Sequence, residues 1–218
     1  MIRLFSGFDQ REEIGFQVFV SSVLEHSSQP VSITALDSKG LPQGSNSFTL
    51  SRFLVPYLCD YKGHAIFADG CDMLMMEDIA ALDALYDPRY AVQVVQRPDY
   101  TSAHERKYIG TSMECEQSNY SRKNWASLML INCEHPAWTG IYPWSIRSCK
   151  PLDLLQLRFC GDDIGDLPEK WNVLVDEGDS FEGAAICHWS SGIPAFPYYC
   201  SAPAAELWAD QATRMLTV

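Results

Sequence analysis

The sequence predicts an α/β fold with a mainly parallel central sheet flanked by helices. Apolar runs of strand length alternate with stretches of helical spacing over the first hundred residues, which is the pattern of βαβ units. Two acidic residues, Asp69 and Asp72, follow the apolar run 65–67, and α/β sheets bind ligands at the carboxyl ends of their strands. Because a length of 218 residues fits one α/β domain rather than two, we expect one core and one domain over 1–218, and the 47% hydrophobic content is enough for a sizeable interior.

The spacing of apolar residues predicts each element in turn. Residues 2–8 are expected to form a strand, and residues 16–24 carry apolar side chains at helical spacing. The segments expected after this helix are strand 30–36, loop 37–47, helix 49–59, strand 63–68, helix 76–86, strands 90–96 and 128–132, and helices 151–159 and 204–216. The polar segment 97–121 is typical of a surface excursion or of a flap over a site.

The composition argues against several classes of partner. A formal net charge of −12 without a cluster of Lys and Arg argues against nucleic acid and anionic membranes. A small anionic substrate stays compatible with this charge if a cation neutralises it locally. No stretch approaches the roughly 18 apolar residues of a membrane span, and the amino terminus lacks an apolar export region. We therefore expect a cytoplasmic or similarly reducing compartment, with the eight cysteines as free, buried thiols.

Three residues are candidate metal ligands. Asp69 and Asp72 are close enough in sequence to share a divalent cation, although the same spacing suits one helix or turn cap and one solvated carboxylate. His188 ends another apolar run and would complete the site, although a histidine there is often a hydrogen-bonded core residue. Asp9, which has capping-box spacing to Glu12, is interpreted as a helix N-cap, a ligand contact or both.

Five segments in a fixed order carry a common pattern. They are Arg52 to Pro56, Phe67 to Leu74 with Asp78-Ile79, Arg122 to Ser127 leading to Asn132-Cys133, Asp162 to Pro168 with Trp171-Asn172, and His188-x-x-x-Gly192-x-Pro194. Together they resemble glycosyltransferases of the GT-A fold, above all the family 8 type and its short uncharacterised relatives. The resemblance implies a Rossmann-like GT-A domain, Mn²⁺ or Mg²⁺, a nucleotide-sugar donor that is usually a UDP-sugar, and a glycan or other hydroxyl acceptor. It leaves the oligomeric state open.

The resemblance also implies roles for individual residues. Asp69, Asp72 and His188 would hold the metal, and Asp69 would also meet the ribose. The residues implied to contact uracil and ribose are Ser6, Gly7, Phe8, Asp9 and Arg11, with Phe8 stacking on the base and Asp9 bonded to it. The residues implied to meet the donor sugar are Arg52 and Asn124, with Asp162 or Asp163 facing its hydroxyls beside the reacting carbon.

The sequence departs from the family pattern at two points. The acidic motif is Asp-Gly-Cys-Asp, one residue longer than Asp-x-Asp, and Gly70 would let the loop bulge because glycine admits positive φ. Ile193 stands where better-known members place a lysine on the diphosphate. We expect backbone N–H groups around Gly192, or else Lys107 or Lys123, to stabilise the leaving group instead.

The stereochemistry and two other activities stay open at this level. An inverting enzyme needs a base, for which Asp162 and Asp163 are the candidates, whereas a retaining family 8 enzyme is thought to use the leaving phosphate. A domain that binds nucleotide or glycan without turnover is one alternative. A sugar-1-phosphate nucleotidyltransferase is another, but the loop 6–9 lacks the Gly-rich, Arg-containing pattern of that class.

Overall fold

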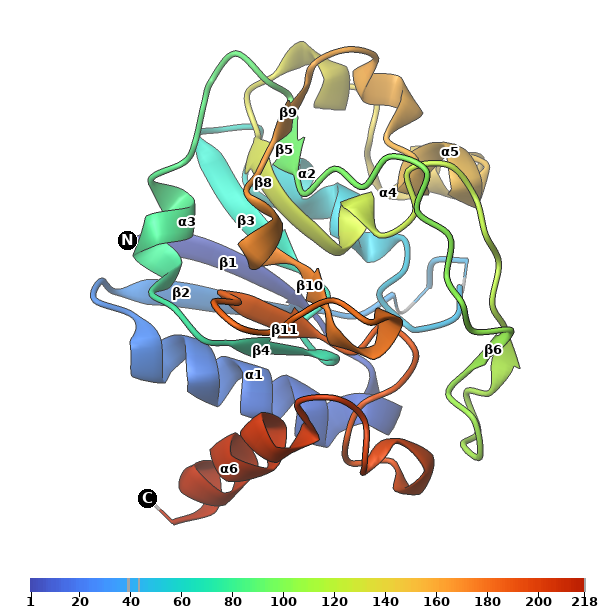
Figure 1. Cartoon of the computed structure of the whole chain (residues 1–218). Helices are drawn as coiled ribbons and strands as arrows, with labels where there is room; N and C mark the ends of the chain where they lie inside the picture. Colours follow the sequence, from blue (N-terminus) through green and yellow to red (C-terminus); the bar gives the residue numbers. More distant parts are fainter. Residues whose placement is uncertain (39, 43, 218) are drawn as a thin grey trace.

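The computed structural model describes residues 1–38, 40–42 and 44–217, and its centre is a six-stranded mixed sheet (Figure 1). The strands, in the order in which they pair, are β2 Val31–Leu36, β1 Ile2–Gly7, β3 His64–Ala68, β8 Leu128–Asn132, β5 Val92–Val94 and β9 Ile164–Asp166. β1 is parallel to β2 and β3, and β5 is parallel to β9, whereas β8 is antiparallel to both of its neighbours. The prediction of a mainly parallel α/β sheet is confirmed, with β8 as the exception.

A small second sheet and a hairpin complete the β-structure. The small sheet pairs β10 Val173–Leu174, β11 Ile186–His188 and β4 Met73–Met75 in that order. β6 Arg106–Lys107 and β7 Cys115–Glu116 form a hairpin within the segment expected to be an excursion or a flap. This hairpin projects from the body of the molecule (Figure 1).

Helices cover both faces of the central sheet. They are α1 Glu13–His26, α2 Val55–Leu58, α3 Ile79–Asp83, α4 Pro143–Ile146, α5 Pro151–Leu155 and α6 Ala205–Leu216. The 3-10 turns are η1 Gln10–Glu12, η2 Ser51–Leu54, η3 Trp125–Ser127, η4 Pro136–Trp138, η5 Arg158–Cys160, η6 Glu169–Trp171, η7 Val175–Glu177 and η8 Pro197–Tyr199. α1 and α6 lie side by side (Figure 1).

The core alternates across the sheet as strand geometry requires. In β3, Ile66 packs into the cluster that contains α1 and α3 residues, whereas Phe67 packs into the cluster that contains α2, α4 and α5 residues. The same alternation occurs in β8, with Leu130 on one face and Ile131 on the other. This burial on both faces explains why the strands are continuous apolar runs in the sequence.

Three sequence expectations for secondary structure are wrong in detail. The expected helix 49–59 is the turn η2 followed by the short α2, with Pro56 in its first turn. Only 79–83 of the expected helix 76–86 is helical. The expected capping box is half formed, because Asp9 accepts from the Arg11 backbone N–H while the Glu12 carboxyl has no hydrogen-bond partner among the described residues.

Two further expectations concern the cysteines and the membrane. All eight cysteines are free thiols, as predicted, although only four of them are buried. In the part of the chain that the structure describes, no helix has both the length and the apolar character needed to cross a membrane.

Candidate active site

A tight turn brings Asp69 and Asp72 to one point at the carboxyl end of β3. Gly70 has φ +73°, and a Cβ atom on it would lie 2.0 Å from Ser6 Oγ, so both the turn and its packing require glycine. The Cys71 N–H donates to the Asp69 carbonyl oxygen at 2.8 Å and closes the turn. The extra residue of the Asp-Gly-Cys-Asp motif is therefore absorbed by the turn.

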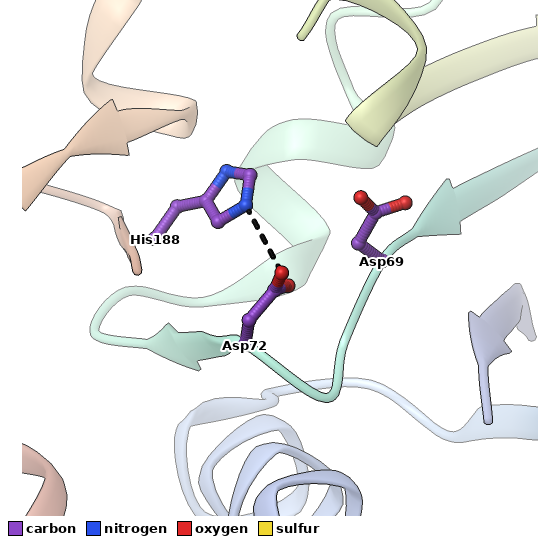
Figure 2. Close-up of side chains that lie close together, drawn as sticks. All are labelled: Asp69, Asp72 and His188. Atoms are coloured by element: carbon purple, nitrogen blue, oxygen red, sulfur yellow. Dashed lines mark ion pairs between the residues drawn. The ribbon is translucent and has the colours of Figure 1, made fainter. Parts of the chain in front are cut away.

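β-pairing carries His188 to the same point from more than one hundred residues away. β11 runs antiparallel to β4, so His188 stands opposite Met73, the residue after Asp72. Asp69, Asp72 and His188 each direct one ligand atom to the same place, and these atoms lie within 4.8 Å of one another (Figure 2). His188 Nε2 lies 3.5 Å from Asp72 Oδ2. All three side chains are buried.

A hydrogen bond from a neighbouring turn orients the histidine ring. His188 Nδ1 lies 2.8 Å from Asn172 Oδ1, and the Asn172 amide nitrogen donates to Ser127 Oγ at 2.9 Å. Because its amide group is thus engaged as a donor on one side, Asn172 acts as the acceptor toward the histidine. His188 therefore carries a proton on Nδ1, and Nε2 faces Asp72.

Arg52 neutralises the first carboxylate of the turn. Its Nη1 lies 2.6 Å from Asp69 Oδ1 and also donates to the Ala126 carbonyl oxygen at 2.8 Å. The guanidinium carbon lies 5.5 Å and 5.1 Å from the ring centroids of Phe48 and Phe67. Arg52 is thus fixed by an ion pair and by two aromatic rings, and its contact with a donor sugar stays a prediction.

The pKa values of three buried side chains at the site, Asp69, His188 and Glu12, are raised. Burial raises the pKa of Asp69 to about 7, although the Arg52 guanidinium opposes this shift. Burial alone would lower the pKa of His188, but the Asp72 carboxylate outweighs it and the pKa is raised. Glu12, which is fully buried, has its pKa raised well above the usual value by burial and by Asp72. Burial therefore favours the protonated form of the Asp69 and Glu12 carboxyl groups when no cation is bound.

The donor set fits a divalent cation. Asp72 Oδ1 is buried without a hydrogen-bond partner among the described residues, and Asp69 Oδ1 has only its ion pair with Arg52. Two carboxylates and one imidazole are ligands that suit Mn²⁺, and the carboxylates suit Mg²⁺. A cation would satisfy the free carboxylate oxygens and would favour the ionised form of these buried carboxyl groups.

A small pocket of about 80 Å³ opens beside these three residues. Besides Asp69, Asp72 and His188, its wall includes three residues predicted from the sequence, namely Arg52, Lys107 and Asn124. Lys107 Nζ donates to Ser45 Oγ at 3.0 Å, and the Tyr108 N–H donates to the Ser191 carbonyl oxygen at 2.7 Å. The β6–β7 hairpin is thereby fastened over the pocket, which is far smaller than a nucleotide sugar.

The structure does not bring the loop after β1 into the pocket. The Asp9 carboxylate accepts hydrogen bonds from Arg11 and Ser47, which overcome the effect of burial and lower its pKa to about 2. Phe8 packs edge-on against Phe16, with ring centroids 5.3 Å apart. None of the five implied base-contacting residues, Ser6, Gly7, Phe8, Asp9 and Arg11, lines the pocket. Asp9 serves as an N-cap, and its contact with a base stays a prediction.

The structure does not bring Asp162 or Asp163 into the pocket, and their contact with a donor sugar stays a prediction. Both precede β9, and β9 begins opposite Val92, which pairs with Ile131 at the far end of β8. The pocket lies at the other end of β8, where Ser127 lines it. Both residues are exposed, and they lie at the end of the sheet away from the pocket. The direction of β9, which decides this position, cannot be read from the sequence.

The backbone around Gly192 and the side chain of Lys123 are also engaged elsewhere. The Gly192 N–H donates to the Trp189 carbonyl oxygen at 3.2 Å, and the residue packs against the Tyr199 ring. Lys123 Nζ donates to Gln117 Oε1 and to the Ser118 carbonyl oxygen. Lys107 is therefore the one of the three predicted phosphate contacts that lines the pocket.

Several residues of the site escaped the sequence analysis. Asn172 was noted only as part of a family motif, and its contact with His188 depends on the pairing of β10 with β11. The uncharged pocket residues to which the sequence assigned no role include Asn46, Thr49, Tyr108, Tyr120, Ser127 and Ser190. The adjacent Lys107-Tyr108 pair within a polar segment was the one available signal for Tyr108.

Comparisons with known proteins agree with this architecture. No family model matches the chain. Protein CDI of Arabidopsis thaliana is 36% identical over 226 residues, which cover 96% of this chain and 85% of Protein CDI. The galactosyltransferase LgtC, solved with donor and acceptor sugar analogues, matches 100% of this chain and 97% of its own at TM-score 0.63 and 14% identity. The bifunctional glycosyltransferase WbbM matches at TM-score 0.69 and 12% identity.

The match to WbbM covers 99% of this chain but spans only about half of the WbbM chain, 51%. GlyE of Streptococcus pneumoniae TIGR4, also a glycosyltransferase, matches at TM-score 0.64 and 11% identity over 99% of this chain and 62% of its own. These likenesses confirm the GT-A fold that the sequence resemblance implied.

Proposed function

The chain belongs to the family of Arabidopsis thaliana Protein CDI and has the GT-A fold of the glycosyltransferases, and from this premise we propose that it is a metal-dependent glycosyltransferase. The proposed donor is a nucleotide sugar, and the family 8 resemblance of the sequence favours a UDP-sugar. The proposed acceptor is a hydroxyl group of a glycan or of another molecule. The fold supports this class of reaction, and the site residues support the metal dependence.

The observation that carries the proposal is the convergence of Asp69, Asp72 and His188 at the carboxyl end of β3. Their free oxygens and the Nε2 atom would hold Mn²⁺ or Mg²⁺. Such a cation supplies Lewis-acid stabilisation to the diphosphate of the donor when it is bound. The same convergence weakens the case for a degenerate binding module, because the longer acidic motif still assembles the ligand set.

Lys107 and Arg52 have separate proposed roles toward the donor. Glycosyl transfer builds negative charge on the departing nucleotide, so a fixed cation beside the diphosphate lowers the barrier. Lys107, which lines the pocket and is held by Ser45, is placed to supply that charge in the absence of the family lysine. Arg52 forms an ion pair with Asp69 and would orient that carboxylate, while the edge of the Arg52 guanidinium group would contact the donor sugar.

The pocket wall favours a retaining reaction. An inverting enzyme needs a base near the acceptor hydroxyl. Asp162 and Asp163 lie at the other edge of the sheet, and the carboxylates that line the pocket among the described residues are Asp69 and Asp72. Because both are assigned to the cation, the leaving phosphate is the base that this arrangement favours.

Donor entry requires the β6–β7 hairpin to move. The pocket of about 80 Å³ is too small for a nucleotide sugar, and the hairpin is held beside it by the contacts of Lys107 with Ser45 and of Tyr108 with Ser191. We propose that these contacts open to admit the donor and re-form around it, which would exclude water from the reacting carbon.

UDP release tests the proposed function. Purified protein is incubated with UDP-glucose, UDP-galactose and UDP-N-acetylglucosamine in turn, with Mn²⁺ or with excess chelator, and free UDP is measured. We expect slow UDP release from at least one donor that requires Mn²⁺ and is absent in Asp72→Ala. No release from any donor, or release that the chelator leaves unchanged, would show that the protein is a binding module or acts on another substrate.

A further inference from the structure

A second hollow lies on the other side of the hairpin from the donor pocket. Its volume is about 240 Å³, and it lies between the hairpin segment 104–109 and the segment 198–203 near the carboxyl terminus. Apolar side chains form much of its wall, including Ile109, Tyr198 and Tyr199. Nothing in the proposed donor or metal site uses these residues.

An exposed aromatic ring dominates this hollow. The Tyr198 side chain is 64% exposed, although tyrosine usually buries its ring. Its neighbour Tyr199 is buried, and the two ring centroids are 5.0 Å apart at 71°. Tyr199 is fixed because its hydroxyl accepts from the Ile109 N–H at 3.0 Å. The exposed Tyr198 ring therefore packs against a fixed, buried Tyr199 ring and presents an aromatic surface to solvent.

Polar groups are arranged around the ring. Ser191 is almost completely buried at 1% exposure, and its Oγ has no hydrogen-bond partner among the described residues. The Asp176 carboxylate accepts from the backbone N–H groups of Ser190 at 3.1 Å and of Ser191 at 2.7 Å, which fixes this wall. Arg106 uses Nε for its contact with Glu114 at 2.8 Å. The Arg106 guanidinium and the Asp176 carboxylate thus line the hollow together with the aromatic ring, and the Ser191 hydroxyl lies buried within its wall.

This combination matches the chemistry of a sugar ring. A pyranose has an apolar face of C–H groups, which stacks on an aromatic ring, and a rim of hydroxyl groups, which need donors and acceptors. Small-molecule sites combine a mostly apolar wall with a few fixed polar groups in the same way. A tyrosine platform costs little conformational entropy, because the side chain has few rotatable bonds.

The hollow and the donor pocket share one thin wall. Ser190 lines the donor pocket and Ser191 lines the hollow, while Lys107 lines the pocket and Ile109 the hollow. The Tyr108 N–H bonds to the Ser191 carbonyl oxygen at 2.7 Å and holds the two halves of the wall together. A chain of sugars lying in the hollow would therefore end next to the donor site.

We propose that this hollow is a saccharide-binding subsite that holds sugar units of a glycan acceptor on Tyr198. Its role in transfer rests on the proposed function, whereas the binding itself does not require turnover. The subsite gives the acceptor a chemical class, an oligosaccharide rather than a protein hydroxyl or a lipid headgroup.

Saturation-transfer NMR on the full chain tests the subsite. The probes are cellobiose, maltose and lactose, with the linear polyol sorbitol as the control ligand. We expect at least one disaccharide to receive saturation, and the affinity to fall at least about tenfold in Tyr198→Ala. Tyr198→Phe should retain most of the affinity, because it keeps the stacking ring. Trp144→Ala is the matched control, since it removes an aromatic side chain of similar exposure, 65%, that lines no part of the hollow.

The outcomes separate this proposal from the proposed function. Asp72→Ala should lose metal-dependent UDP binding and keep the disaccharide signal. A wild-type protein that binds a disaccharide through Tyr198 but no nucleotide would support the subsite and contradict the transferase. Saturation of no disaccharide, or a signal that persists in Tyr198→Ala, would overturn the subsite whatever the nucleotide result.

Discussion

Asn172 Oδ1 accepts the hydrogen bond of His188 Nδ1 at 2.8 Å, and this contact decides which ring nitrogen faces the acidic turn. The Asn172 amide nitrogen in turn donates a hydrogen bond to Oγ of Ser127, the residue just before β8. A proton on Nδ1 leaves Nε2 as the atom that faces Asp72. The ligand set therefore depends on a residue that would not touch the metal.

Removing this support should weaken the metal site without removing a ligand. We expect Asn172→Ala to lower Mn²⁺ affinity by about 10- to 100-fold, the usual effect of losing such a partner of a ligating histidine. An electron paramagnetic resonance titration of free Mn²⁺ measures this. Asn132→Ala is the control. Asn132, the last residue of β8, is buried like Asn172, but its amide nitrogen donates to the Pro88 carbonyl oxygen and not to the site. Equal Mn²⁺ affinity in Asn172→Ala and wild type would refute the role of Asn172.

The Glu12 carboxyl should make the metal-free protein less stable as the pH rises. Burial raises its pKa in the folded state, so at a pH above about 4.3 the unfolded chain ionises while the folded chain keeps its proton. Asp69, with a folded pKa of about 7, acts in the same direction. The free energy of unfolding should therefore fall as the pH rises from about 4 to 7, and it should continue to fall above pH 7.

Glu12→Gln isolates this effect, because glutamine keeps the shape and cannot ionise. We expect this variant to be more stable than wild type at pH 8 and to lose part of the pH dependence, as measured by urea unfolding at pH 5 and pH 8 in chelator. Glu206→Gln, at an exposed position, serves as the control. A variant less stable than wild type at pH 8 would mean that the folded protein holds Glu12 ionised.

Arg52 should matter for stability as well as for the donor. Both members of the Arg52–Asp69 pair are buried, so Arg52→Ala leaves an unpaired buried carboxylate and should cost about 3–5 kcal/mol of unfolding free energy. Arg52→Ala combined with Asp69→Asn should cost less than the sum of the two single changes. Urea unfolding of the four proteins measures the coupling. Strict additivity would show that the pair does not interact.

Lys107 should act on turnover rather than on metal binding. We expect Lys107→Met to slow UDP release by about 100- to 1,000-fold, the typical effect of losing one fixed group that stabilises transition-state charge. Mn²⁺ affinity should stay unchanged, because Lys107 is no ligand. Lys150→Met provides the control at an exposed position. Normal turnover in Lys107→Met would remove Lys107 from the proposed mechanism.

The sequence predicted the elements whose patterns are local. The strand, turn, helix and strand over the first 36 residues, and the acidic pair after β3, follow from runs of apolar residues and were placed correctly. The short β4 was missed because three residues carry no periodicity, and its pairing with β11 is what delivers His188 to the turn. His188 was nevertheless a candidate ligand, because it ends an apolar run and also matches the family pattern.

The failures have a shared physical origin in tertiary structure. Asp162 and Asp163 lie outside the pocket because of the direction of β9, which depends on its pairing with β5. The resemblance implied that the loop after β1 contacts the base, but Gly7 lies against Phe48, and a Cβ on Gly7 would lie 2.4 Å from that ring. Neither the direction of a distant strand nor the cover of a loop is encoded in local spacing.

Calorimetric titration of UDP, GDP and CMP into the purified protein, each with Mn²⁺ and then with excess chelator, tests the central claim most directly. The proposal predicts that UDP binds in preference to GDP and CMP, that chelator abolishes this binding, and that Asp72→Ala lacks it while keeping the wild-type fold. Nucleotide binding that is insensitive to chelator and to Asp72→Ala, or no nucleotide binding at all, would contradict the claim that Asp69, Asp72 and His188 form the metal centre of a nucleotide-sugar site.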